Sequence, residues 1–133
     1  MRLSRSEFVR RLVLNSISDD FENVDQVILR DVAEDAAKCG LAVERPEVVE
    51  ALAALIEEGL AKAYISPPSK DDPPSGELQG MPPMEAVEED FKTYFYRTKK
   101  GLDFRTSDDA WWPFDDEDEL RPDWHLKPDS ALY

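Results

Sequence analysis

The order of one helix, one strand, a long interruption and a second strand most constrains the fold of this chain. Apolar residues at helical spacing, ending at Gly59, predict a helix with one buried face. Residues 60–65 alternate as a strand does, and residues 94–97 suit an aromatic partner strand. Residues 66–90 between them hold six of the ten prolines and seven acids, so we expect a mobile tip that buries little.

Two more helices are predicted before this unit. The first opens at Ser4 or Ser6, because either side chain can cap exposed backbone N–H groups. The second begins near Asn23, another capping residue, and ends at Gly40, which is free to adopt a positive φ. The third carries Pro46 in its first turn, where helices tolerate proline. The predicted buried faces are Phe8, Val9, Leu12, Val13 and Ile17; Val24, Val27, Ile28, Val32, Ala36 and Cys39; and Val48, Val49, Leu52, Leu55 and Ile56.

The ends of the third helix and of the second strand resemble those of a known fold family. Gly59-Leu60 follows the helix, and Tyr94-Phe95-Tyr96-Arg97-Thr98-Lys99-Lys100-Gly101 places an aromatic strand before a Thr-x-x-Gly motif. Over about residues 6–104 the chain resembles the winged-helix regulators of bacteria, notably those of the PadR and MarR types. The resemblance implies a mainly α fold with a small antiparallel β wing, a winged helix-turn-helix of the α+β class. We therefore expect a winged-helix domain at 1–106, with its wing at 66–90, and an acidic aromatic tail at 107–133.

In that family the third helix reads the major groove of DNA and the wing contacts phosphates. The resemblance would give groove reading to Glu47, Glu50, Ala54 and Glu57, and phosphate contact to Lys92, Arg97, Lys99 and Lys100. The helix departs from the family pattern, because three of these four residues are glutamates. Carboxylates that face a duplex are repelled by its phosphates. We therefore expect the four helix residues to contact a protein, for which a basic surface is the complement.

The net charge of −14 weighs against nucleic acid, anionic lipid and acidic substrates as partners, because like charges repel at long range. Residues 91–106 differ, with five bases and one acid, whereas residues 107–133 carry two bases and nine acids. The five bases, called the basic island below, are Lys92, Arg97, Lys99, Lys100 and Arg105. They either pair with the acidic tail or wing, or bind DNA. The arginines near the start, Arg2, Arg5, Arg10 and Arg11, are interpreted as a solvated helix face.

All three tryptophans lie in the acidic tail, as Trp111, Trp112 and Trp124, together with Phe114. A purely solvating acidic tail would contain few aromatic residues. We therefore expect these side chains to pack on the domain or on a dimer mate, or else to anchor another protein partner. Prolines at 113, 122 and 128 interrupt the tail, so it lacks the long dimerisation helix frequent in the PadR and MarR families. Whether the chain forms a homodimer stays open.

Motifs for catalysis and metal binding are weak. His125, the single histidine, lies in a proline-flanked segment with no nucleophile in an adjoining motif. Cys39 falls on an apolar helix face, as a structural thiol does. The run 115–119 is acidic enough to attract a divalent cation but lacks the ligand spacing and glycine of a calcium-binding loop. We expect no enzyme activity, no cofactor, no metal site and no membrane segment, in a cytoplasmic protein.

The leading functional hypothesis is a small non-enzymatic regulator or adaptor that acts through protein contact. The alternative is a transcription regulator whose basic island binds DNA and whose acidic tail masks it. A further alternative, a protein that mimics DNA, depends on the acidic segments alone.

Overall fold

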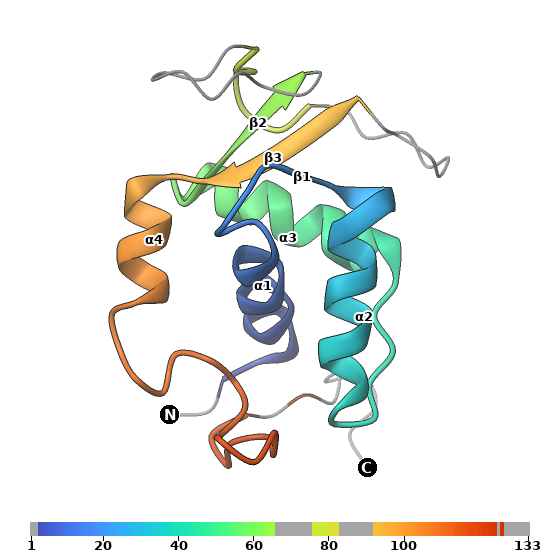
Figure 1. Cartoon of the computed structure of the whole chain (residues 1–133), viewed down its shortest axis with the longest axis vertical. Coiled ribbons are helices and arrows are strands. Elements are labelled where there is room, and N and C mark those ends of the chain that lie inside the picture. The colour runs from blue at the N-terminus through green and yellow to red at the C-terminus, as the bar shows by residue number, and fades with distance from the viewer. Residues whose placement is uncertain (1–2, 66–75, 83–91, 125, 127–133) are drawn as a thin grey trace.

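The computed structural model describes residues 3–65, 76–82, 92–124 and 126. Within these residues the architecture is α+β, with four α-helices, one π-helical turn and a three-stranded antiparallel sheet. In chain order the elements are α1 (Arg5–Ser16), β1 (Glu22–Asn23), the π-helical turn η1 (Val24–Ile28), α2 (Leu29–Ala37), α3 (Arg45–Glu57), β2 (Ala61–Ile65), β3 (Thr93–Arg97) and α4 (Lys99–Arg105). The sheet lies at one end of α1 and α2, with α3 running beneath it, and α4 flanks α1 (Figure 1).

The predicted helix ends are confirmed where the sequence supplies a cap. Ser4 and Asn23 each accept hydrogen bonds from backbone N–H groups of the following turn. Gly40 and Gly59 adopt φ values of +75° and +76°, the left-handed conformation that closes a helix. The second helix differs from the prediction in its first turn, which is the π-helical η1.

The sheet has the strand order β1–β3–β2, so that β3 is the central strand. Ala63 lies opposite Phe95, and both side chains are buried in the core. The short β1 pairs with the other edge of β3, where Glu22 lies opposite Phe95. The third strand therefore consists of two residues that the sequence pattern alone does not mark as a strand.

Residues 76–82, the described part of the expected wing, pair with the edge of β2 and include no fully buried residue. The N–H of Ile65 donates to the carbonyl oxygen of Gly76 at 2.9 Å, and the N–H of Leu78 donates to that of Ala63 at 2.8 Å. Leu78 and Met81 also pack, partly buried, against the core. This segment therefore covers the edge of β2 that would otherwise present unpaired backbone groups. The rest of the expected wing, 66–75 and 83–90, lies outside the described residues.

The second half of the basic island is helical, whereas the resemblance to winged-helix proteins predicted that it lies at the end of a wing. Thr98 caps α4 by accepting a hydrogen bond from the N–H of Gly101 at 3.0 Å. A Cβ atom at Gly101 would lie 2.1 Å from the carbonyl oxygen of Leu60. Glycine at this position therefore lets α4 pack against the chain that leads into β2.

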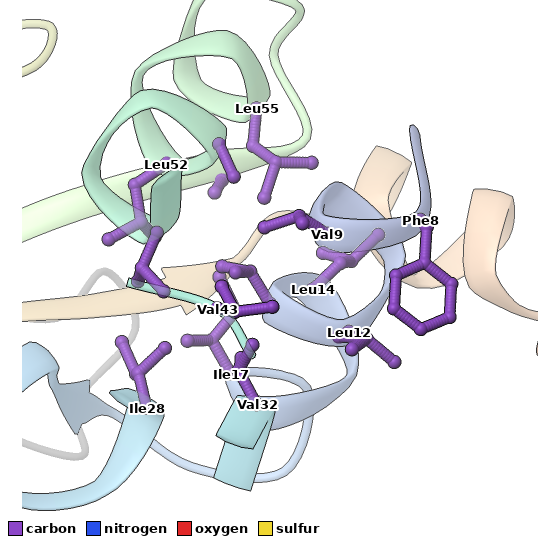
Figure 2. Close-up of a cluster of buried hydrophobic side chains, with 14 of the residues drawn as sticks. Phe8, Val9, Leu12, Leu14, Ile17, Ile28, Val32, Val43, Leu52 and Leu55 are labelled. Atoms are coloured by element: carbon purple, nitrogen blue, oxygen red, sulfur yellow. The ribbon is translucent and has the colours of Figure 1, made fainter. Parts of the chain in front are cut away.

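The core is built around α1, whose side chains lie between those of α2 and α3 (Figure 2). The tail contributes to the same core, because the rings of Phe114 and Trp124 each lie 5.9 Å from that of Phe8. The tail residues in the core are Trp111, Phe114, Trp124 and Leu126. The described part of the tail thus packs on its own chain.

Of the helices in the described ranges, none is long and apolar enough to cross a lipid bilayer.

Candidate functional site

The surface where α1 meets α3 is held by ion pairs between the two helices. Arg5 donates from Nε and Nη2 to the carboxylate of Glu47, at 2.8 and 3.1 Å. Its Nη2 also donates to the carbonyl oxygen of Ala42 at 2.8 Å. The hydrogen bond from Arg5 is the main reason that the pKa of Glu47 lies below its ordinary value. The carboxylate of Glu47 is therefore compensated by Arg5.

A second pair lies at the far end of α3. Arg10 pairs with Glu58, which follows α3, and with Glu7 on its own helix at 3.3 Å. Glu7 also accepts from Nε of Arg11 at 2.8 Å. The prediction of a solvated helix face is wrong for Arg5, Arg10 and Arg11, because their side chains keep only 22%, 22% and 13% of their surface exposed. Their cations are used within the chain. Arg2 lies outside the described residues.

Between the two helices lies a groove of about 420 Å³. Its lining comes from one face of each helix, because residues three, four and seven apart lie on the same side. Val9 and Ala51 are the buried members of this lining, so the deep part of the groove is apolar and the charged groups lie at its edges. The lining residues are Arg5, Ser6, Val9 and Arg10 of α1, and Glu47, Glu50, Ala51 and Ala54 of α3.

The four residues expected on the outward face of α3 do not all lie at the same surface. Glu47, Glu50 and Ala54 line the groove, and Glu57 does not. Glu50 and Glu57 are both exposed, and neither has an ion-pair or hydrogen-bond partner in the part of the chain that the structure describes. Two uncompensated carboxylates therefore remain on α3.

Arg45 is the single base of α3, and it is turned to an internal contact. Its Nε donates to the carboxylate of Asp25, at the start of η1, at 2.9 Å. The side chains of Arg45 and Asp25 are only 11% and 6% exposed. This pair joins α3 to the start of the second helix, and so it positions the helix rather than offering a cation to solvent.

The basic island is divided between β3 and α4. Arg97 donates to the carbonyl oxygen of Ser18 at 3.2 Å, and its guanidinium lies 4.5 Å from the ring centre of Tyr96. Arg105 donates to the side-chain oxygen of Asn15 at 2.7 and 3.0 Å. Arg105 therefore joins α4 to α1, and Arg97 joins β3 to the turn that follows α1.

The lysines of the island are nearer to solvent. Lys100 donates to the carbonyl oxygen of Glu58 at 2.9 Å. Lys99 pairs with Asp103 at 3.1 Å while its side chain stays 87% exposed, and Lys92 is exposed before β3. No carboxylate in the described part of the tail pairs with the island: the tail's acid Asp118 contacts Lys38 at 3.3 Å instead. The structure therefore does not show the tail covering the island.

The aromatic residues of the tail lie around α1, with Arg11 at their centre. Its guanidinium lies 5.1 to 5.5 Å from the ring centres of Trp124, Trp111 and Phe104, and Nη1 donates to the carbonyl oxygen of Trp111 at 2.7 Å. Trp111, Phe114 and Trp124 are buried, so they offer little surface to a partner. Trp112 is half-buried and is the most accessible of the four aromatic candidates.

The groups considered for chemistry do not form a site in the described ranges. Cys39 is half-buried, and burial raises the pKa of its thiol, which contacts the carbonyl oxygen of Ala36 at 3.4 Å. Asp115 accepts hydrogen bonds from the N–H groups of Glu117 and Glu119, so the acidic run forms a turn. No cluster of three or more His, Cys, Asp or Glu side chains that could hold a metal ion occurs there. His125 lies outside the described residues.

Three of the α3 residues expected to contact a partner, Glu47, Glu50 and Ala54, line the groove, which the sequence did not predict. Arg5, Ser6, Val9 and Arg10 share a helix face, and this spacing could have indicated a second contact stripe on α1. Which helix would lie opposite depends on the tertiary fold. Comparisons with protein families, curated proteins and solved structures found no match to this chain. The winged-helix assignment therefore stays a prediction from sequence.

Proposed function

We propose that this chain is a small non-enzymatic regulator or adaptor of the winged-helix type, acting through protein contact rather than by reading DNA. Support for the winged-helix assignment comes from the order of the elements: three helices, then a hairpin of β2 and β3, with β1 on the far edge of β3. In that arrangement α3 takes the place of the helix that enters the major groove.

The observation that carries this proposal is the internal pairing of Arg45. Duplex affinity depends on Lys and Arg that neutralise phosphates, and base edges are read most often by Arg, Lys, Asn and Gln. The sole base of α3 is bound to Asp25, while Glu50 and Glu57 remain exposed. A duplex against this helix would meet two carboxylates without a compensating cation from α3. A protein surface that carries bases has no such penalty.

The basic island is the less favoured alternative. Its arginines donate to Ser18 and Asn15, Lys100 donates to the carbonyl oxygen of Glu58, and Lys99 pairs with Asp103, so these four bases already have partners within the chain. The side chain of Lys99 is 87% exposed. If the island bound DNA, Lys99→Glu would weaken that binding, whereas the present proposal gives no duplex binding to weaken.

Duplex binding at low salt tests the proposal with the intact chain and two matched variants. Glu50→Lys/Glu57→Lys reverses the charge of the exposed face of α3, and Asp116→Lys/Glu117→Lys makes the same charge change on an exposed turn of the tail. We expect no saturable, sequence-selective binding by the wild type, and a gain in salt-dependent affinity for the α3 variant only. Tight, sequence-selective binding by the wild type would overturn the proposal. So would an equal gain in both variants, because overall charge rather than α3 would then be the barrier.

A further inference from the structure

The groove between α1 and α3 has the size and the apolar depth of a binding site. Its deep part is apolar, being formed at Val9 and Ala51, and its volume of about 420 Å³ falls within the range of sites that bind ligands or side chains. The hollow exists because α3 presents alanines at 51 and 54 toward α1. A larger side chain at either position would fill it.

The charges around the groove decide which occupant fits. Arg5 is held by Glu47, and Arg10 is held by Glu58 and Glu7, so neither guanidinium is available for an anionic ligand without breaking an ion pair. Glu50 lies in the lining, is exposed, and has no ion-pair or hydrogen-bond partner among the residues that the structure describes. The uncompensated charge at the groove is therefore negative, and the net charge of −14 has the same sign.

We propose that the α1–α3 groove binds a basic amphipathic segment of a partner protein, which inserts an apolar side chain beside Ala54 and pairs a Lys or Arg with Glu50. This inference rests on the proposed function and specifies its partner. An amphipathic helix laid into a groove between helices is a recurring mode of peptide recognition, with apolar residues as anchors. Here the apolar depth supplies the affinity, and Glu50 selects partners by charge and sets their register.

Two pairs of matched variants separate this site from general attraction between opposite charges. Ala54→Leu fills the groove, and Ala53→Leu makes the same change at the neighbouring half-buried position, which does not line it. Glu50→Lys reverses the charge at the groove, and Glu57→Lys does so on the same helix outside it. Each variant is first compared with the wild type by circular dichroism and thermal unfolding.

The binding probe is a synthetic amphipathic helix of Leu and Lys, labelled for fluorescence anisotropy, with a Leu/Glu peptide and an Ala/Lys peptide as controls. We expect saturable binding of the Leu/Lys peptide only. Ala54→Leu should weaken it about tenfold, because the added side chain occupies the space of the anchor. Glu50→Lys should weaken it at least about fivefold, and the two control substitutions less than about twofold.

Backbone amide NMR of the wild type with the same peptide gives a readout that requires no variant. Shift changes concentrated at Ser6, Val9, Ala51 and Ala54 are expected. Shifts spread over the acidic surface, or equal affinity in Ala54→Leu and Ala53→Leu, would overturn the groove site. Because the duplex-binding experiment is independent, that result leaves the proposed function standing, whereas tight duplex binding would remove both.

Discussion

Replacing Phe114 by alanine tests whether the tail belongs to the same cooperative core as the helices. Phe114 is 1% exposed, and its ring lies edge-on to Phe8, at 5.9 Å between ring centres. Truncation of a buried Phe to Ala costs about 3–5 kcal/mol, from lost burial and the cavity left behind. A domain of this kind has a total unfolding free energy of about 5–15 kcal/mol, so the variant should lose a large part of its stability.

The distribution of tryptophan makes the assay informative. All three tryptophans lie in the tail, whereas α1, α2 and α3 precede it, so tryptophan fluorescence and far-ultraviolet circular dichroism report on different parts of the chain. In urea the two transitions should coincide for the wild type, and both should shift together in Phe114→Ala. Phe114→Leu, which keeps most of the volume, should cost at most about 1.5 kcal/mol, and it gives a measurable transition if the alanine variant does not fold.

Two results would refute the reasoning about the tail. A fluorescence transition at lower urea than the dichroism transition would show that the tail is a separate layer. A midpoint that rises with protein concentration would show that the tail packs on another copy. The control is Asp116→Ala, an exposed change in the same segment, which should alter the unfolding free energy by less than about 0.5 kcal/mol.

Two further predictions concern the packing of α4 and the α1–α3 ion pairs. Gly101→Ala should destabilise the chain by about 2–3 kcal/mol in urea unfolding, because its Cβ would lie 2.1 Å from the Leu60 carbonyl oxygen, whereas Gly40→Ala, with open space around it, should cost about 1 kcal/mol for its positive φ alone; equal costs would contradict the packing argument. Because the pKa of Glu47 is lowered in the folded state, its ion pair stabilises the fold above the ordinary value of 4.5, and this stabilisation is lost as the pH falls through the lowered pKa. The urea midpoints of the wild type and Glu47→Gln should therefore differ at pH 7 and converge in acid, and a difference that is constant with pH would exclude the ion pair as its cause.

The helices and the β2–β3 hairpin could be predicted because each has a local signal. Caps at Ser4 and Asn23 and left-handed glycines at 40 and 59 fix the helix ends independently of the rest of the fold. The strand β1 could not be predicted, because two residues become a strand only through pairing with β3. Local chemistry therefore gives the elements, and tertiary pairing gives the third strand.

The helix α4 was missed for a different reason. Thr98 is a good capping residue, but Gly101 disfavours a helix by propensity, and the aromatic strand before it resembled the end of a wing. The glycine is required by the approach of the Leu60 carbonyl group, which no local pattern reveals. A residue chosen for tertiary packing can thus conceal the element in which it lies.

Under the proposed function, pairing with α1 reduces the negative charge of α3 without making the helix suitable for DNA. Arg5 pairs with Glu47, and Arg10 pairs with Glu58, which follows α3, so a phosphate would have to compete with a carboxylate for either guanidinium group. A helix that binds DNA needs cations directed away from the core. Here each arginine that compensates α3 is bound in an ion pair with a glutamate of α3 or next to it. Glu50 and Glu57 remain exposed without a partner among the described residues, and Glu50 lies beside an apolar groove. That combination suits a basic protein segment, because its cation can pair with Glu50 at the edge of the groove. Its apolar side chain is then removed from water in the deep part.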